Sequence, residues 1–237
     1  MQRFWEIDAL RGIAIIMMVL FHFLWDLKYF GFINFNLYSG FWGYFQVATA
    51  SLFLLLAGMM VALGTQKYGE MGSFNLVKRG AFIFSVGVLI TFVTYLIFPN
   101  DFIYFGILHL IGVSIIIAIP IAKRKLIPLI VGLIFIVLPL LINLQSFGID
   151  LLVWVGFAVP KSTLDFEPVI PWMGAFLVGV FLFNLFYNGG KRNFKLKDNQ
   201  GFFSRKLQFL GKKSLVIYLV HQPVMFLIVY LVTLFFH

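Results

Sequence analysis

Seven long apolar stretches dominate this sequence and limit what it can fold into. A helix needs about 20 apolar residues to cross the hydrocarbon core of a bilayer, and each stretch is close to that length. Hydrophobic residues make up 62% of the chain and charged residues 11%, which is too little charge to cover a soluble globule. The sequence therefore predicts an all-α, polytopic helical membrane protein with about seven transmembrane helices. The expected spans are residues 9–27, 42–64, 80–98, 102–122, 126–144, 168–188 and 214–236.

The positions of the basic residues predict how these spans are oriented. Cytoplasmic loops of membrane proteins carry an excess of Lys and Arg. With the N-terminus inside and the C-terminus outside, only Lys28 and Lys161 of the 18 Lys and Arg residues fall in external loops. The net charge of +9 then belongs to loops that face anionic lipid, so we expect the bilayer and no nucleic acid as partner. The expected location is the cell (cytoplasmic) membrane.

Residues 1–237 are expected to form a single integral-membrane domain. The sizeable cytoplasmic loop, residues 189–213, alternates Phe and Leu with Lys and Arg, a pattern typical of an amphipathic helix on a membrane surface. Residues 151–159 are apolar but too short to cross, and Pro160 follows them, which predicts an interfacial or re-entrant segment. Small residues let helices approach closely and would also permit a homodimer. Those expected at helix contacts are Gly106, Gly112, Gly174 and Gly179.

Ionisable residues inside a span are costly, so each is a candidate for function. In the first span Asp8, Arg11, His22 and Asp26 share one face, since Arg11 and His22 lie three helical turns apart. In one interpretation Asp8 and Arg11 pair at the inner interface and Asp26 is an external surface charge. In the other, a polar track runs up the helix and Asp26 orients His22 as a general base.

Two further histidines lie in predicted spans, His109 in the fourth and His221 in the seventh. A lone buried histidine is usually structural, but three in one small membrane protein indicate function. Counting 1.5 Å per residue puts His22 and His109 in the outer half and His221 nearer the inner side, which argues against a shared metal site. No metal or haem is therefore expected. Trp172, beside two prolines, is either an interfacial anchor or a residue that stacks on a substrate.

Short motifs also follow one another in a set order along nearly the whole chain. They are Ile7–Gly12, Phe21–Leu27, Ser51–Gly58, Gly106–His109, Asp165–Gly174 and Ser214–Pro223. In this order and spacing the chain resembles the heparan-α-glucosaminide N-acetyltransferase catalytic-domain family, and within it the small prokaryotic branch.

The resemblance implies a transmembrane acyltransferase with acetyl-CoA or another acyl-CoA as co-substrate. It would move an acyl group, expected to be acetyl, from the cytoplasm to an acceptor such as a sugar amine or hydroxyl outside. The spacing of Arg11 and His22, with ten residues between them, also resembles a pattern of the related acyltransferase-3 proteins. The histidine of that pattern is taken as catalytic in those proteins. Lysosomal members use a histidine in the loop after this helix. None lies between Lys28 and Gly43, so either His22 takes that role or the mechanism differs.

The expected site has catalytic, acceptor-binding and donor-binding parts. The catalytic pair is His22 with Asp26, acting by direct transfer or through an acyl-histidine, and both routes stay open. His109, His221 or Gln222 could donate hydrogen bonds to the thioester oxyanion. The residues expected near the acceptor are His109, Asp165, Trp172, His221 and Gln222. Those expected to bind acyl-CoA are Asp8, Arg11, Lys78, Arg79, Lys212, Lys213, Ser214 and Tyr218.

Two other classes of protein fit the same polar residues. A transporter or channel could use the histidine-lined track as a permeation path without binding acyl-CoA. A b-type cytochrome could ligate haem with histidines from different helices. Stabilisation by CoA would favour the enzyme over the transporter, and a colourless purified protein would exclude haem.

Overall fold

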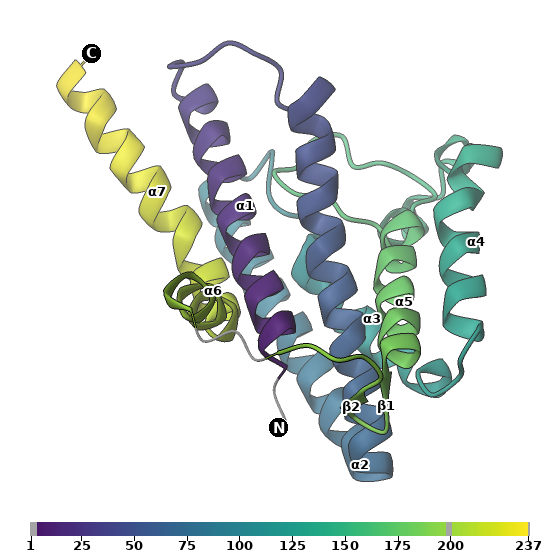
Figure 1. The fold of residues 1–237 in the computed structure, drawn as a ribbon. Helices are drawn as coiled ribbons and strands as arrows, with labels where there is room; N and C mark the ends of the chain where they lie inside the picture. The colour runs from purple at the N-terminus through teal and green to yellow at the C-terminus, as the bar shows by residue number, and fades with distance from the viewer. Residues whose placement is uncertain (1–3, 198–200, 237) are drawn as a thin grey trace. The chain divides into compact units, whose positions relative to one another are not determined.

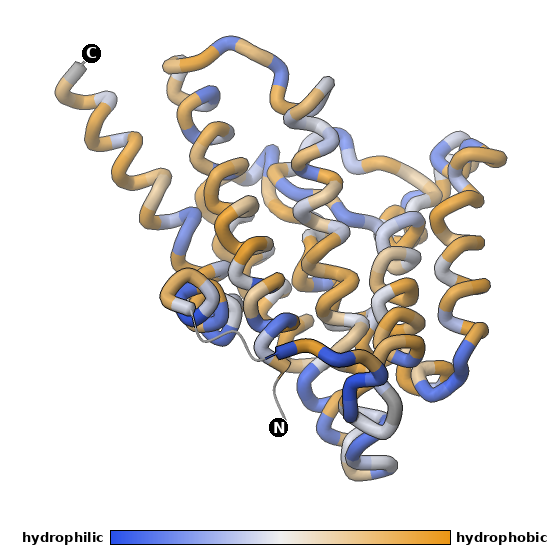
Figure 2. The backbone as a smooth tube through the Cα atoms, in the orientation of Figure 1, coloured by the Kyte–Doolittle hydropathy of each residue, from blue (hydrophilic) through white to orange (hydrophobic). Residues whose placement is uncertain are grey.

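The protein is all-α apart from one two-stranded hairpin in the computed structural model, which describes residues 4–197 and 201–236 (Figure 1). Long apolar helices able to cross a membrane, together with shorter apolar ones, confirm the predicted all-α polytopic fold. The long ones are α1 (Trp5–Tyr29), α2 (Gly40–Ile97), α5 (Val169–Phe186) and α7 (Ser214–Phe236); the shorter ones are α3 (Ile107–Ala118) and α4 (Ile127–Leu141). Figure 2 shows α4 and α7 as largely hydrophobic tubes.

Two expected spans, residues 42–64 and 80–98, both fall within α2, which reverses direction between them. Gly69 has non-helical angles (φ 56°, ψ −130°). A Cβ at Gly64 would lie 3.0 Å from the Leu76 side chain, whereas a straight helix would separate these residues by about 18 Å. The chain therefore turns back at Gly69, where a positive φ favours glycine.

Two segments outside the long helices have extended or 3₁₀ backbone. Helix α3 begins at Ile107, later than expected, because Phe105 forms a parallel bridge with Phe166 and accepts a hydrogen bond from the Glu167 amide (2.9 Å). The expected interfacial segment contains the short 3₁₀ helix η3 (Asp150–Val155), which is far too short to cross a membrane. Other 3₁₀ turns are η1 (Ile119–Ile121) and η2 (Leu144–Phe147).

The basic segment after α5 contains the predicted amphipathic helix. A hairpin of β1 (Tyr187–Asn188) and β2 (Lys191–Arg192) comes first, and α6 (Phe202–Lys212) follows. Helix α6 buries Ser204 and Gly211 and leaves Phe203 80% exposed. Figure 1 shows α6 nearly end-on while α1 and α7 are seen from the side, so α6 runs across them as a helix at a membrane surface would.

The chain divides into two compact units. Unit 1 combines the chain up to Phe53 with the chain from Leu196 onward, and unit 2 is Leu54–Lys195. The single domain expected over residues 1–237 stays a prediction. In unit 1, α6 crosses α1 backbone to backbone. A Cβ at Gly12 would overlap the carbonyl of Leu207, and one at Gly211 would overlap the carbonyl of Asp8.

Most of the glycines predicted at helix contacts in unit 2 do lie at such contacts. The nearest atoms to an added Cβ include the carbonyl oxygen of Gly80 for Gly112 and that of Gly132 for Gly174. At Gly179 the added Cβ would overlap the carbonyl oxygen of Leu55. Gly106 differs, because its neighbour is the Asp165 carboxylate at the start of α3 rather than a second helix.

Candidate functional site

His22, in the second half of α1, is held in one tautomer by its own helix. Its Nδ1 lies 2.9 Å from the carbonyl oxygen of Met18. A carbonyl oxygen only accepts hydrogen bonds, so Nδ1 carries the proton and donates it. In the neutral ring Nε2 then bears a lone pair, and the ring is only partly buried. His22 is therefore set up to accept a proton at Nε2.

The ring of His221 from α7 lies against His22. The ring centroids are 4.9 Å apart at an interplanar angle of 82°. Nδ1 of His221 donates to the carbonyl oxygen of Tyr218 (2.6 Å), and Nε2 is buried with no hydrogen-bond partner among the described residues. In the neutral ring of His221, Nε2 likewise bears a lone pair. The expected donation from His221 to an oxyanion would require it to gain a proton first.

This contact corrects the depth assigned to His221 from residue counts. The sequence predicted His221 nearer the inner side than His22, and that prediction is wrong, because the two rings touch. A residue count gives the distance along one helix and not the offset between two helices, so it could not place His221 relative to His22.

Asp26 is fully buried and bonds to α7 rather than to His22. Its Oδ1 accepts a hydrogen bond from Nε2 of Gln222 (2.7 Å). Among the described residues no hydrogen bond joins Asp26 to His22, whose Nδ1 is already bonded to Met18. The idea that Asp26 orients His22 is therefore wrong in this geometry, and so is the reading of Asp26 as an external surface charge. Oδ2 of Asp26 and Oε1 of Gln222 are buried and without hydrogen-bond partners among the described residues.

The donor-binding residues predicted in unit 1 gather where α1, α6 and α7 begin or end. Arg11 lies 3.9 Å from Asp8, and both side chains are mostly buried beside α6. Lys212 and Lys213 are exposed between α6 and α7. Ser214 and Tyr218 lie in the first turns of α7. The expected pair of Asp8 and Arg11 is therefore present, next to exposed positive charge.

His109 in unit 2 is engaged at both ring nitrogens. Its Nδ1 accepts a hydrogen bond from the Gly106 amide (3.2 Å), which caps the start of α3. Its Nε2 lies 3.4 Å from the Thr91 hydroxyl, which itself donates to the carbonyl of Ile103 (2.7 Å). Contact with an acceptor stays a prediction for His109; in this geometry the ring holds α3 to its neighbours.

Two acidic residues of unit 2, Asp165 and Glu167, lie in the loop before α5. Asp165 accepts a hydrogen bond from the Ile107 amide (3.2 Å), yet burial raises its pKa to about 6. Glu167 is 5% exposed, and burial with the nearby Asp165 raises its pKa well above the usual range. Trp172 is partly exposed in the first turn of α5. Lys78 and Arg79, the donor-binding residues predicted in this unit, are exposed on α2.

Replacing Asp165 with asparagine should remove part of the pH dependence of stability. Because the pKa is raised from 3.8 to about 6 on folding, stability falls as the pH rises between these values, by up to about 3 kcal/mol. Asparagine keeps the acceptor for the Ile107 amide and does not ionise. We expect Asp165→Asn to raise Tm near pH 7 and not near pH 4. Thermal unfolding across this range tests it, with the exposed Asp150→Asn as control; a parallel shift at both pH values would contradict it.

Among the described residues no group of three His, Cys, Asp or Glu side chains is arranged to hold a metal ion. The geometry instead offers two nitrogen bases in contact in unit 1 and a pair of buried carboxyls in unit 2.

Comparison with known proteins decides between the classes that these residues allow. The family model for the heparan-alpha-glucosaminide N-acetyltransferase catalytic domain matches residues 3–223, which is nearly the whole chain. The chain belongs to this family. Comparisons with curated proteins and with solved structures gave no match. Membership of the acetyltransferase family, together with the apolar helices, indicates a multi-pass membrane acetyltransferase.

Several contacts of this family member were not identified from the sequence. The Met18 carbonyl fixes His22, but a backbone group leaves no mark in residue type. Gly12 and Gly211 could have been noticed, because small residues facing each other mark close helix crossings. Glu167 was not singled out from the sequence, although it is among the most buried acids of unit 2.

The Asp26–Gln222 bond gives a sharp prediction for acetyl transfer by this protein. Asn at position 26 can still accept from Gln222, so Asp26→Asn should keep nearly wild-type activity and stability. Asp26→Leu leaves the Gln222 amide buried and unpaired, which should cost about 1–3 kcal/mol. If Asp26 instead acted as a carboxylate on His22, Asp26→Asn would lower the rate by about 10⁴-fold. Transfer rates and Tm of the two variants, measured side by side, separate these outcomes.

Proposed function

We propose that this protein transfers an acetyl group from cytoplasmic acyl-CoA to an amine or hydroxyl of an extracytoplasmic acceptor such as a saccharide. His22 is the general base. The observation that carries the proposal is the locked tautomer of His22, with Nδ1 bonded to Met18 and Nε2 left as an acceptor beside His221. Family membership supports the acetyl group.

The chemistry follows from this tautomer. Nε2 of His22 takes the proton of the acceptor as its nitrogen or oxygen attacks the thioester carbonyl carbon. The new bond to the acetyl carbon forms, the carbon–sulfur bond breaks, and the CoA thiolate leaves. The proton on His22 then passes to that thiolate. In the alternative route Nε2 itself attacks the thioester, the carbon–sulfur bond breaks, and the CoA thiolate leaves an acetyl-histidine. The acceptor then attacks the acetyl carbon, the bond to Nε2 breaks, and the acceptor's proton passes to the thiolate. Asp26 acts as a positioning residue through Gln222.

Donor binding is proposed for basic residues in each unit. In unit 1 these are Arg11, Lys212 and Lys213, with Asp8, Ser214 and Tyr218 beside them. In unit 2 they are Lys78 and Arg79. The phosphates of acyl-CoA are strongly anionic, and guanidinium groups bind phosphate in a bidentate fashion. The protein is placed in the cell membrane with its N-terminus in the cytoplasm, which would put these cations on the donor side.

Acceptor binding is proposed for Asp165 and Trp172 in unit 2. A carboxyl and an indole are suited to the hydroxyls and the apolar face of a sugar ring. His221 and Gln222 in unit 1 are proposed near the reacting atoms because they contact His22 and Asp26. His109 is proposed as a support for the outer end of unit 2.

Binding of acetyl-CoA to the purified protein tests the proposal first. Calorimetry should show saturable binding to the wild type and weaker binding to Arg11→Ala. The matched control is Lys28→Ala, which removes a cation from the opposite end of the same helix and should bind like wild type. If neither acetyl-CoA, longer acyl-CoAs nor CoA bind, the protein is not an acyl-CoA enzyme, and transport through the polar track becomes the leading function.

A further inference from the structure

The contact between α1 and α7 encloses the carboxyl group of Asp26. One turn before it on α1, the His22 ring lies against His221, with the ring centroids 4.9 Å apart. One turn after it, Phe30 packs on Phe226 of α7, also with 4.9 Å between the centroids. Asp26 is fully buried between these two contacts. Both helices are long and apolar enough to cross a membrane, so bulk water is kept away from this carboxyl.

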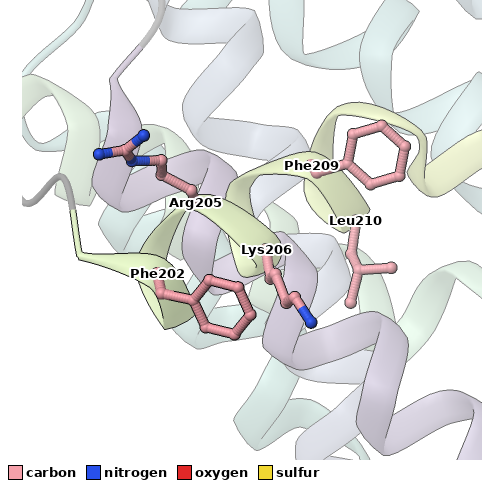
Figure 3. Close-up of a pocket in the computed structure, with 5 residues that line it drawn as sticks. All are labelled: Phe202, Arg205, Lys206, Phe209 and Leu210. Atoms are coloured by element: carbon pink, nitrogen blue, oxygen red, sulfur yellow. The ribbon is translucent and has the colours of Figure 1, made fainter.

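No cation is placed to balance a negative charge on Asp26. The titratable side chains on the second half of α1, on α7 and on α6, the helices packed against α1, are His22, Lys28, Tyr29, Tyr218, His221, Tyr230, Arg205, Lys206 and Lys212. In the part of the chain that the structure describes, none of them forms an ion pair with Asp26. Figure 3 shows two of these cations, Arg205 and Lys206, at a hollow on α6 itself. A carboxylate buried without a counter-charge is costly, and this cost favours the neutral acid.

The same contact lacks a hydrogen-bond donor. Nε2 of Gln222 donates to Oδ1 of Asp26 (2.7 Å). Oδ2 of the carboxyl and Oε1 of the amide are left buried, with no partner among residues 4–197 and 201–236. Both atoms are acceptors while Asp26 is ionised, so neither can satisfy the other. A proton on Oδ2 supplies the donor that both atoms lack.

A metal ion suits this position less well than a proton does. Ca²⁺ takes about six to eight oxygen ligands, whereas the unpartnered oxygen atoms of this contact are Oδ2 of Asp26 and Oε1 of Gln222. Among the described residues, no group of three His, Cys, Asp or Glu side chains could complete such a site. The proton is therefore the cation that the geometry accommodates.

We propose that Asp26 binds a proton and is a neutral carboxylic acid whose Oδ2 hydroxyl donates to Oε1 of Gln222. Together with the bond from Nε2 to Oδ1, this closes a ring of two hydrogen bonds between one carboxyl and one amide. The ring holds α1 to α7 and keeps His22 against His221. Loss of the proton breaks one of the two bonds and leaves a charge in an apolar contact, so the contact weakens as the pH rises. This proton site does not depend on acetyl transfer.

Infrared spectroscopy of the protein in nanodiscs at about pH 7 tests the protonation of Asp26 directly. The C=O stretch of a carboxylic acid lies above the amide I band, where ionised carboxylates and amides do not absorb. The spectrum of the wild type minus that of Asp26→Asn should show this band, and D₂O should lower its frequency. The control Asp150→Asn, which removes an exposed carboxyl, should show no such band. Carboxylate bands in its place for Asp26→Asn would overturn the proposal.

A second variant tests the hydrogen-bonded ring. In Gln222→Met the acid loses both bonds to the amide, so its C=O band should move to higher frequency. An unmoved band would refute the ring.

The pH dependence of stability gives a test that does not need Gln222→Met to fold. An aspartate in the unfolded chain is ionised above about pH 4, so folding takes up a proton and stability falls as the pH rises. Asparagine has the same donor and acceptor and no charge to gain. Tm of the wild type should therefore fall relative to that of Asp26→Asn between about pH 5 and about pH 8. Asp165 is present in both proteins and cancels in this comparison; a Tm difference that stays constant with pH would contradict the proton site.

Discussion

Replacing His22 with glutamine is expected to lower the rate of acetyl transfer by about 10²–10⁴-fold, the contribution of a general base. The glutamine amide can still donate to the Met18 carbonyl, so helix α1 should keep its local structure. It cannot take a proton from the acceptor. The loss should appear in kcat with little change in acetyl-CoA binding. Transfer assays in nanodiscs, with calorimetry on the same samples, measure both.

The neighbouring histidine provides the comparison. Nε2 of His221 is buried without a hydrogen-bond partner in the part of the chain that the structure describes, so it could also take the proton. His221→Gln tests whether His221 or His22 is the base. A small loss relative to His22→Gln would leave His22 as the base. Full activity of His22→Gln together with an inactive His221→Gln would move the base to α7, and full activity of both would end the histidine mechanism.

The second large effect is expected in stability, at the crossing of α6 over α1. An alanine at position 211 places a methyl group on the Asp8 carbonyl, and a backbone atom cannot move aside as a flexible side chain can. The helices must separate, which should cost about 1–3 kcal/mol and lower Tm by several degrees. Thermal unfolding of Gly211→Ala in detergent measures this loss.

Gly64→Ala is the matched control. Its Cβ would meet only the end of the Leu76 side chain, at 3.0 Å. Alanine also favours helix over glycine by up to about 1 kcal/mol. We therefore expect Gly64→Ala to leave Tm unchanged or raise it. Equal destabilisation by both substitutions would show that the backbone contact in unit 1 is not the cause.

The sequence predicted the helices well, because apolar length alone decides what can cross a bilayer. The structure has helices at all the expected spans, and the amphipathic helix α6 lies in the expected segment. The late start of α3 could not be predicted. It depends on Phe105 pairing with Phe166, a contact between distant segments that hydropathy does not record.

The candidate site was predicted in its residue types but not in its contacts. The spacing along α1 placed His22 and Asp26 on one face and suggested that they bond to each other. Their partners instead come from the Met18 carbonyl and from Gln222 of α7. Periodicity within a helix indicates which residues share a face, whereas the register between two helices depends on where each begins.

The discontinuity of unit 1 has a consequence for biosynthesis. Unit 2 is one continuous run of chain, while α1 must wait for α6 and α7, which are made after unit 2. At about 5–20 residues per second, α1 stays without these partners for on the order of ten seconds or more after it leaves the ribosome. Asp26 and His22 of α1 meanwhile lack Gln222 and His221, the α7 residues that contact them. A chain whose synthesis stops before α6 would therefore lack the contact between His22 and His221.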